Sequence, residues 1–266
     1  HGVYPTIAWT PDSASLVLWS KGTLHRVRLS DGVTQDIPFH VKHTRRMLTP
    51  LRQRVDVAPE RVQTKMLRWV RVSPDGTKAL YQALGHLYIQ DIPLGKARRL
   101  TKQEEHWELY PSFSPDGRHV LYTTWDDQAL GSIRMVSTRG GKGKVLSREP
   151  GHYISPQLSP DGRHVVYKRV GGGWLTSPRW TEKKGLYALP LSKKGEETRI
   201  SYSGSDPHFG AGSERVFFYD TIEKGERELR SARLDGHELR KHVVSAEAMS
   251  FRVSPDERFI AWQEGY

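Results

Sequence analysis

The chain has 266 residues, of which 36% are hydrophobic and 10% aromatic, a composition typical of globular proteins and not of disordered ones. Its net charge of +11 comes from short basic clusters separated by acidic stretches, and no basic helix or aromatic-basic strand accompanies them, so we expect no nucleic-acid partner. The absence of cysteine excludes disulfides and thiolate metal sites, and no apolar run is long enough for a membrane span.

A hairpin repeat runs along the whole chain and includes the motif Ser-Pro-Asp-Gly in its best copies. Equivalent turn positions are Thr10, Ser73, Ser114, Ser159, Gly210 and Ser254, at intervals of 63, 41, 45, 51 and 44 residues. A period near 40 residues is typical of propeller blades. We therefore predict an all-β fold, a β-propeller of about six four-stranded blades with an incomplete last blade.

The turn itself has a clear physical basis. Proline presets φ for the first turn position, aspartate can bond to nearby backbone, and glycine supplies a positive φ. An alternating apolar strand follows each turn, as in residues 78–82, 119–123 and 164–168. The sequence 210–213 lacks the proline and aspartate but keeps two glycines, so we expect its hairpin to survive with a different turn.

We predict a single propeller domain over residues 1–266. Its blades are expected near residues 6–39, 68–101, 109–147, 153–201, 205–245 and 249–266. The long first interval predicts an insertion over residues 40–66, which either contacts another domain or is a tolerated surface excursion. A smaller excursion, residues 171–181, holds two tryptophans that could line a binding surface or pack over the rim.

The two ends of the sequence indicate a piece of a longer polypeptide. His1 is not a natural start, and the sixth unit ends at Tyr266 after two strands. A ring normally completes its last blade with strands from both termini, so we expect an exposed strand edge here.

No nucleotide-binding loop, nucleophile elbow or zinc-protease motif is present, so we predict no catalytic residue, no cofactor and no metal site in this segment. The pair His40 and His43 has a spacing too weak to indicate a metal site. The most suggestive polar residues lie near the starts of the first strands, where blade geometry brings them toward one mouth of the channel. These candidates, all expected just before the first strands of their units, are Glu105, His106, Glu108, His152, Tyr153, Asp206 and His208. They could bind a cation or polar ligand, or form a solvated polar rim.

The repeated Ser-Pro-Asp-Gly, the following strand with tyrosine, and the closing Arg-Leu-Thr of residues 99–101 resemble the TolB-type propeller repeat. Longer strings, in residues 1–5, 69–76, 84–88, 122–125 and 251–255, resemble the propeller region of exported bacterial proteins that end in an amidohydrolase domain. This resemblance implies further repeats upstream and a metal-dependent hydrolase barrel downstream. The ligands of that barrel have no counterpart here, so no catalytic residue is carried over.

We therefore expect a non-catalytic propeller that acts as a scaffold, gate or protein-binding module of a larger exported or periplasmic bacterial hydrolase. Its partner would be another domain of the same polypeptide or an envelope protein. The alternative is a propeller enzyme with a polar or metal site at the channel mouth. Bound metal with ligands among His106, His152 and His208 would favour the enzyme.

Overall fold

The computed structural model describes residues 7–47, 56–60, 62–171, 183–192 and 195–264. The chain divides into two compact units, residues 1–60 and 61–266, and the boundary falls inside the predicted insertion. The described residues of that insertion form no strand. Almost all of the excursion 171–181 lies outside the described residues. That all six sheets form one domain stays a prediction.

Strands make up nearly all the regular structure, in five four-stranded sheets and one two-stranded sheet. The first unit contains β1 (Ile7–Trp9), β2 (Ser15–Ser20), β3 (Thr23–Arg28) and β4 (Thr34–Ile37). The second unit begins with β5 (Arg68–Val72), β6 (Lys78–Ala83), β7 (His86–Asp91) and β8 (Arg98–Arg99), followed by β9 (Trp107–Phe113), β10 (His119–Trp125), β11 (Ile133–Ser137) and β12 (Lys144–Val145). It continues with β13 (Tyr153–Leu158), β14 (His164–Arg169), β15 (Gly185–Pro190) and β16 (Thr198–Ser201), and then β17 (Ser205–Phe209), β18 (Arg215–Thr221), the short 3-10 helix η1 (Glu223–Gly225), β19 (Arg227–Arg233) and β20 (Arg240–Ser245). The last sheet consists of β21 (Ala248–Val253) and β22 (Ile260–Glu264).

The all-β prediction and the order of strands within each repeat are confirmed. Each four-stranded sheet is an antiparallel meander in which neighbours in the chain pair with one another. The sixth unit holds two strands, as predicted, and within the described residues β22 pairs only with β21.

The Ser-Pro-Asp-Gly turns are held by a small hydrogen-bond network. In the turn before β6, the Ser73 hydroxyl donates to Asp75 Oδ1 at 2.5 Å, and the backbone N–H groups of Lys78 and Thr77 donate to the Ser73 Oγ and Asp75 Oδ1 atoms at 2.8 and 3.1 Å. The hydrogen bond from Ser73 is the main reason that the pKa of Asp75 falls to about 2. Gly76 has φ +72°, a left-handed conformation that glycine adopts without strain.

The turn between β17 and β18 forms without its proline and aspartate, and its Ala211, which stands in the place of the proline, has a backbone N–H that bonds to a neighbouring repeat. Glu257 Oε1 accepts a hydrogen bond from the Ala211 N–H at 2.9 Å. A Cβ atom on Gly210 would lie 2.3 Å from the same oxygen, so only glycine leaves room for it. The two departures from the repeat, at residues 210–213 and at Glu257, therefore compensate one another.

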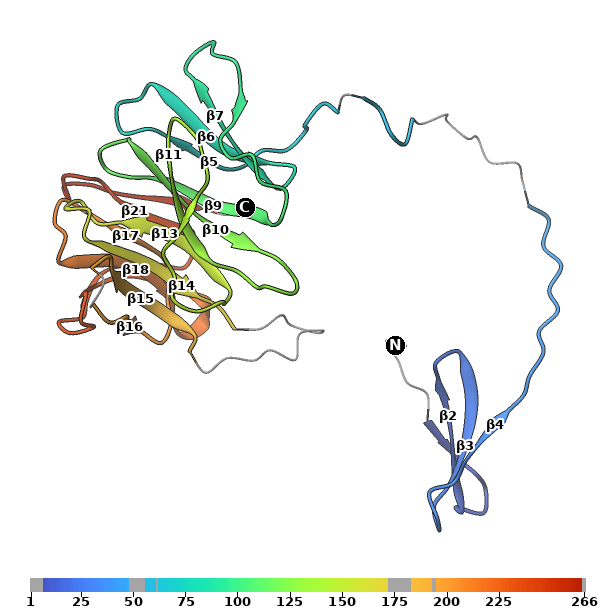
Figure 1. Ribbon diagram of the computed structural model, residues 1–266. Helices are drawn as coiled ribbons and strands as arrows, with labels where there is room; N and C mark the ends of the chain where they lie inside the picture. Colours follow the sequence, from blue (N-terminus) through green and yellow to red (C-terminus); the bar gives the residue numbers. More distant parts are fainter. Residues whose placement is uncertain (1–6, 48–55, 61, 172–182, 193–194, 265–266) are drawn as a thin grey trace. The chain divides into compact units, whose positions relative to one another are not determined.

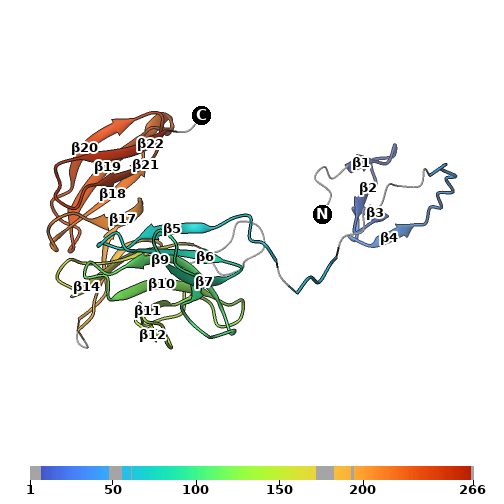
Figure 2. The ribbon, with the colours of Figure 1, turned by 90° about the horizontal axis from the view of Figure 1, so that it is seen from above.

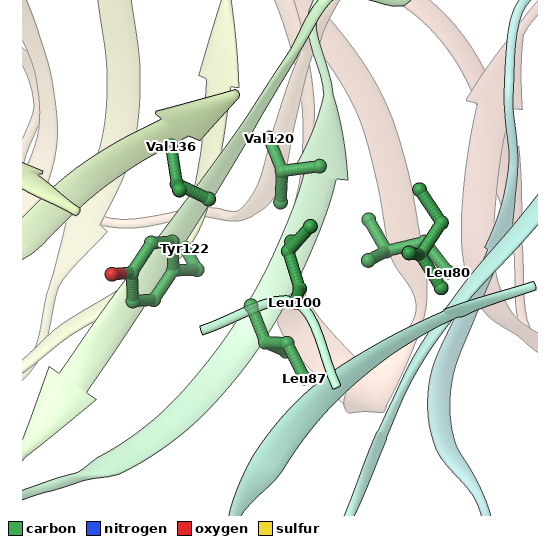
Figure 3. Packing of buried hydrophobic residues seen from close by; sticks show 7 residues of the cluster. Leu80, Leu87, Leu100, Val120, Tyr122 and Val136 are labelled. Atoms are coloured by element: carbon green, nitrogen blue, oxygen red, sulfur yellow. The ribbon is translucent and has the colours of Figure 1, made fainter. Parts of the chain in front are cut away.

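The hydrophobic core lies between successive sheets. Leu80, Leu87 and Leu100 pack against Val120 and Tyr122 of the next sheet (Figure 3). The pattern continues in β14, where Val165 packs toward the preceding sheet and Val166 toward the following one. This division follows from strand geometry, since consecutive side chains point to opposite faces. Each sheet of the second unit is thus covered by its neighbours in the chain, which follow one another in Figures 1 and 2.

Candidate functional site

The first strand of each sheet in the second unit lines a common cavity. Strands β5, β9, β13, β17 and β21 contact one another in chain order. The cavity has a volume of about 550 Å³ and lies at the end of these strands where the Ser-Pro-Asp-Gly turns are found. Each of the five strands contributes two residues to its wall: Arg71, Val72, Ser112, Phe113, Gln157, Leu158, His208, Phe209, Arg252 and Val253. This volume is in the range of ligand-binding cavities.

A bulge occurs at the same point in four of these strands. Trp69, Tyr110, Ser155 and Asp206 all have φ between +50° and +55°, and the pairing register with the next strand shifts around each of them. A bulge turns the side chains that follow it and tightens the local twist. The repeated bulge therefore gives these four strands the same bend where they line the cavity.

Two residues beyond each bulge, the strands carry the polar residues of the cavity wall. These equivalent positions hold Arg71, Ser112, Gln157 and His208, and Arg252 lies at the same distance before its turn. The Arg252 guanidinium forms an ion pair with Asp206 across neighbouring strands, with 2.7 Å between Nη2 and Oδ1. The charge of Arg252 is thus balanced inside the protein.

His208 connects strands β17 and β21 through both ring nitrogens. Nδ1 lies 2.9 Å from the carbonyl oxygen of Asp206, and Nε2 lies 3.1 Å from the backbone nitrogen of Val253. Because the Val253 N–H donates to Nε2, this nitrogen is unprotonated and the ring is neutral. Burial lowers the pKa of His208 to about 4, which is consistent with that role. His208 therefore has a structural role: it links β17 to β21, and both of its ring nitrogens are already hydrogen-bonded.

Arg71 has no comparable partner. Within the described residues its side chain forms one hydrogen bond, from Nη1 to the Val70 carbonyl oxygen at 3.4 Å, and no ion pair. Burial lowers the pKa of Arg71, the nearby charge of Arg252 lowers it further, and the charge of Asp206 raises it. Among the described residues, the cavity wall thus contains one partly desolvated cation that forms no ion pair of its own.

An aromatic pair accompanies this arginine at the level of the bulges. The rings of Trp69 and Tyr110 lie 4.4 Å apart between their centroids, at an interplanar angle of 39°. They come from neighbouring first strands, β5 and β9. Neither ring lines the cavity, and the apolar part of its wall comes from Val72, Phe113, Leu158, Phe209 and Val253.

Two of the predicted mouth residues, Glu105 and His106, lie in the connection before β9 and line two shallower cavities there. The Nε2 atom of His106 is buried without a hydrogen-bond partner in the described part of the chain. Burial, followed by the charge of Arg134, lowers the pKa of His106. This histidine is therefore neutral at physiological pH.

Glu108 is a structural residue inside the protein. It is fully buried in β9, where Oε2 accepts from the Leu87 N–H at 2.9 Å and Oε1 accepts from the Gln103 side chain at 2.8 Å and from the Thr101 hydroxyl. These bonds join two neighbouring sheets. All of its acceptor capacity is directed into the protein, so it does not face a ligand.

His152 and Tyr153 occupy a third location, around the start of β13. The His152 ring lies 5.1 Å from the Trp125 ring, and burial lowers its pKa. The Tyr153 hydroxyl donates to the Glu149 carbonyl oxygen at 2.8 Å, and burial raises the pKa of Tyr153 to about 12. Both residues pack against the protein.

Among the predicted site residues, only His208 thus lines the large cavity, and Asp206 is connected to it through the ion pair with Arg252. Four of the seven lie within strands, and only Glu105, His106 and His152 lie in connections before them. Among the described residues, no three His, Asp or Glu side chains form a group that could hold a metal ion. The prediction missed Arg71, Gln157 and Arg252, although the aligned repeats place all three in one column, two residues before the turn.

Comparison with solved structures supports the propeller architecture. The chain is similar to a protein from Agrobacterium tumefaciens assigned as TolB (19% identity, TM-score 0.53, covering 90% of this chain and 80% of that one). It is also similar to TolB from Acinetobacter baumannii (18% identity, TM-score 0.51, 91% and 55%) and to an oligogalacturonate lyase from Vibrio parahaemolyticus (11% identity, TM-score 0.56, 95% and 68%). At these identities the similarity establishes the TolB-like propeller fold and nothing finer.

No protein-family model and no curated protein sequence matches the chain. The structures that it resembles include both enzymes and proteins without enzymatic activity in their names, so they do not assign a role. Within the described residues, no helix has the length and apolar character needed to cross a membrane.

Proposed function

We propose that the second unit is a non-catalytic binding module whose ligand-binding surface is the cavity at the turn end of the first strands. One observation carries this proposal: all five first strands contribute to one cavity, and its wall presents an arginine without an ion-pair partner among the described residues. Its other charged and titratable groups are engaged, since Arg252 is paired with Asp206 and His208 is bonded through both nitrogens. A cavity wall in which one charged side chain remains available for a ligand favours a ligand-binding role over a catalytic one.

The ligand that we propose is a segment of polypeptide, from another domain of the same protein or from an envelope protein. A scaffold or gate in a larger exported hydrolase of the amidohydrolase type would use the cavity in this way. The resemblance of the repeat strings to such proteins supports this context and a periplasmic or otherwise exported location. The sequence of the gene on either side of this segment tests the context directly, since a downstream barrel with a His-x-His start is expected.

A photo-crosslinking experiment tests the binding surface. A benzoylphenylalanine at position 157, on the cavity wall, should crosslink to one defined polypeptide in an envelope extract or in the full-length protein, whereas the same group at the exposed position 142 should not. Identical adducts from both positions, or none from position 157, would contradict the proposal.

The second candidate function is a propeller enzyme, and the burial of His106 without a partner for Nε2 is the observation that favours it. Metal analysis of the purified protein separates the two functions. Stoichiometric bound metal that is lost on replacing His106 or His152 would establish the enzyme and remove the binding-only proposal.

A further inference from the structure

We infer that the cavity of the second unit recognises a single carboxylate group, which binds to the Arg71 guanidinium. This inference rests on the proposed function, because it names the chemistry that the cavity selects. Three features of the described residues support it: the charge balance of the wall, the hydrogen-bond capacity left at Arg71, and the neighbouring groups that complete a carboxylate site.

The charge balance of the cavity leaves one positive charge uncompensated. Its charged wall residues are Arg71 and Arg252, and Asp206 neutralises Arg252. His208 is neutral, as its hydrogen bonds require. At the turn end of the strands, Glu257 accepts from the Ala211 N–H, and the turn aspartates, such as Asp75, accept from the serine hydroxyls of their own turns. The remaining charge is that of Arg71, which matches a monoanion better than a doubly charged phosphate.

Arg71 also keeps its hydrogen-bonding capacity. A guanidinium has five N–H donors in a planar fork, and that of Arg71 uses one of them, in a long bond to Val70. A carboxylate accepts two parallel hydrogen bonds from such a fork. Partial burial of Arg71 makes the pairing more favourable, because an anion would restore the stabilisation that the cation loses with its water.

The groups around Arg71 fit the remainder of such a ligand. Gln157 has no side-chain hydrogen bond within the described residues, so its amide can donate to a carboxylate oxygen. Val72, Phe113 and Leu158 of the cavity wall provide an apolar surface for the carbon atoms that bear the carboxylate. The Ser112 hydroxyl contributes little, because it already donates to the Pro156 carbonyl oxygen at 2.6 Å.

The carboxylate could belong to an acidic side chain of a polypeptide or to a free small acid. Two probes distinguish these sources: acetyl-Gly-Glu-Gly-amide and butyrate, a small acid with one carboxylate. Acetyl-Gly-Gln-Gly-amide, which has the same shape without the charge, is the control for the peptide. The readout is the arginine Nε–Hε resonances of the ¹⁵N-labelled 266-residue chain during titration with each probe.

We expect the Glu peptide to shift the Arg71 resonance and the Gln peptide to leave it unchanged. The variant Arg71→Gln, in which the resonance of the neighbouring Arg252 reports binding, should bind at least about tenfold more weakly, the effect of losing a charge-assisted bidentate pair. Arg118→Gln removes the same charge from an exposed turn and should bind as the wild type does. Thermal melting of both variants checks that they are folded.

The outcomes of this experiment distinguish a failure of the carboxylate inference from a failure of the proposed binding function. Binding of butyrate but not of the Glu peptide, with the same dependence on Arg71, identifies a free acid as the ligand and contradicts a polypeptide partner. Equal binding of the Glu and Gln peptides, or unchanged affinity in Arg71→Gln, overturns the carboxylate inference but leaves a binding cavity. If no probe shifts the Arg71 resonance, the inference is wrong, and the crosslink from position 157 decides the binding function independently.

Discussion

The first sheet of the chain, β1–β4, and the second, β5–β8, have the same local design but differ in burial. Strands β2 and β6 begin at residues 15 and 78, and β3 and β7 at residues 23 and 86, so that both pairs are offset by 63 residues. The hairpin pairs are also equivalent, since Ser20 pairs with Thr23 and Ala83 pairs with His86. The turn chemistry therefore sets strand length and register equally well in both units.

The difference lies in what covers the strands. Leu80 and Leu87 are fully buried in the second unit, and both pack in the cluster shared with the next sheet. Their equivalents Val17 and Leu24 are only half-buried in the first unit. At the position of the buried Ile89, the first unit has Arg26, which donates to the Ser15 hydroxyl oxygen at 3.1 Å. A repeat thus encodes its own hairpins, but its core depends on a neighbour.

The largest effect is expected from truncating the equivalent leucines. Leu87→Ala removes a fully buried side chain and should lower the free energy of unfolding by about 2–5 kcal/mol, through lost transfer energy and the cavity left behind. Leu24→Ala should cost less than about 1.5 kcal/mol because its side chain is already partly hydrated. Urea unfolding measures the first, and hydrogen exchange of the β2 and β3 amides measures the second. Equal costs would show that Leu24 is covered as well as Leu87 is.

A medium effect on stability is expected from replacing His208 with alanine. His208 lies two residues before the turn of the fifth sheet, and the equivalent position of the first sheet is Ala8. His208→Ala removes the hydrogen bond between β17 and β21 and leaves the Val253 N–H unpaired. The free energy of unfolding should fall by about 1–3 kcal/mol.

The same variant tests the pKa of His208 through the pH dependence of stability. The folded pKa of about 4 lies below the unfolded value of 6.5, so the unfolded state binds more protons between these values. The contribution is complete above pH 6.5 and is lost as the pH falls toward 4. Urea unfolding from pH 7 to 4 should show a loss of stability in the wild type that is smaller in His208→Ala. If the stability of the two proteins changed with pH in the same way, His208 would not be a buried neutral histidine in the folded state.

The smallest effect concerns the last turn position, which is Ser13 in the first hairpin and Gly76 in the second. Both are left-handed, with φ of 57° and 72°. Gly76→Ser should therefore destabilise its hairpin by about 1 kcal/mol, and Ser13→Gly should stabilise the first hairpin by a similar or smaller amount. Amide exchange in the flanking strands measures both. Changes of the same sign would show that φ does not control these turns.

The local part of this fold could be read from the sequence because it depends on contacts within a few residues. The turn residues Ser73, Asp75 and Gly76 specify the hairpin by hydrogen bonds that span five residues at most. The alternation of side chains then gives the strands and their buried faces. Even the altered turn at residues 210–213 was predicted to close, since its glycines keep the needed backbone freedom.

The candidate site could not be predicted in the same way, because its residues meet only in the tertiary structure. The polar residues near the strand starts made His106, Glu108 and His152 candidates. Both carboxylate oxygens of Glu108, however, accept hydrogen bonds within the protein, from Leu87 and Gln103. The compensation between Glu257 and Ala211 spans 46 residues and has no local signature.

The sequence by itself determined the repeat and its hairpins. Only the tertiary structure showed that the residues two positions before the turns line a cavity, and decided which of them remain available. Asp206 neutralises Arg252, backbone groups occupy His208, and Arg71 keeps its charge without a partner among the described residues. The physical reason is that charge balance and desolvation are properties of the assembled strands, since they depend on neighbours that are far apart in the chain.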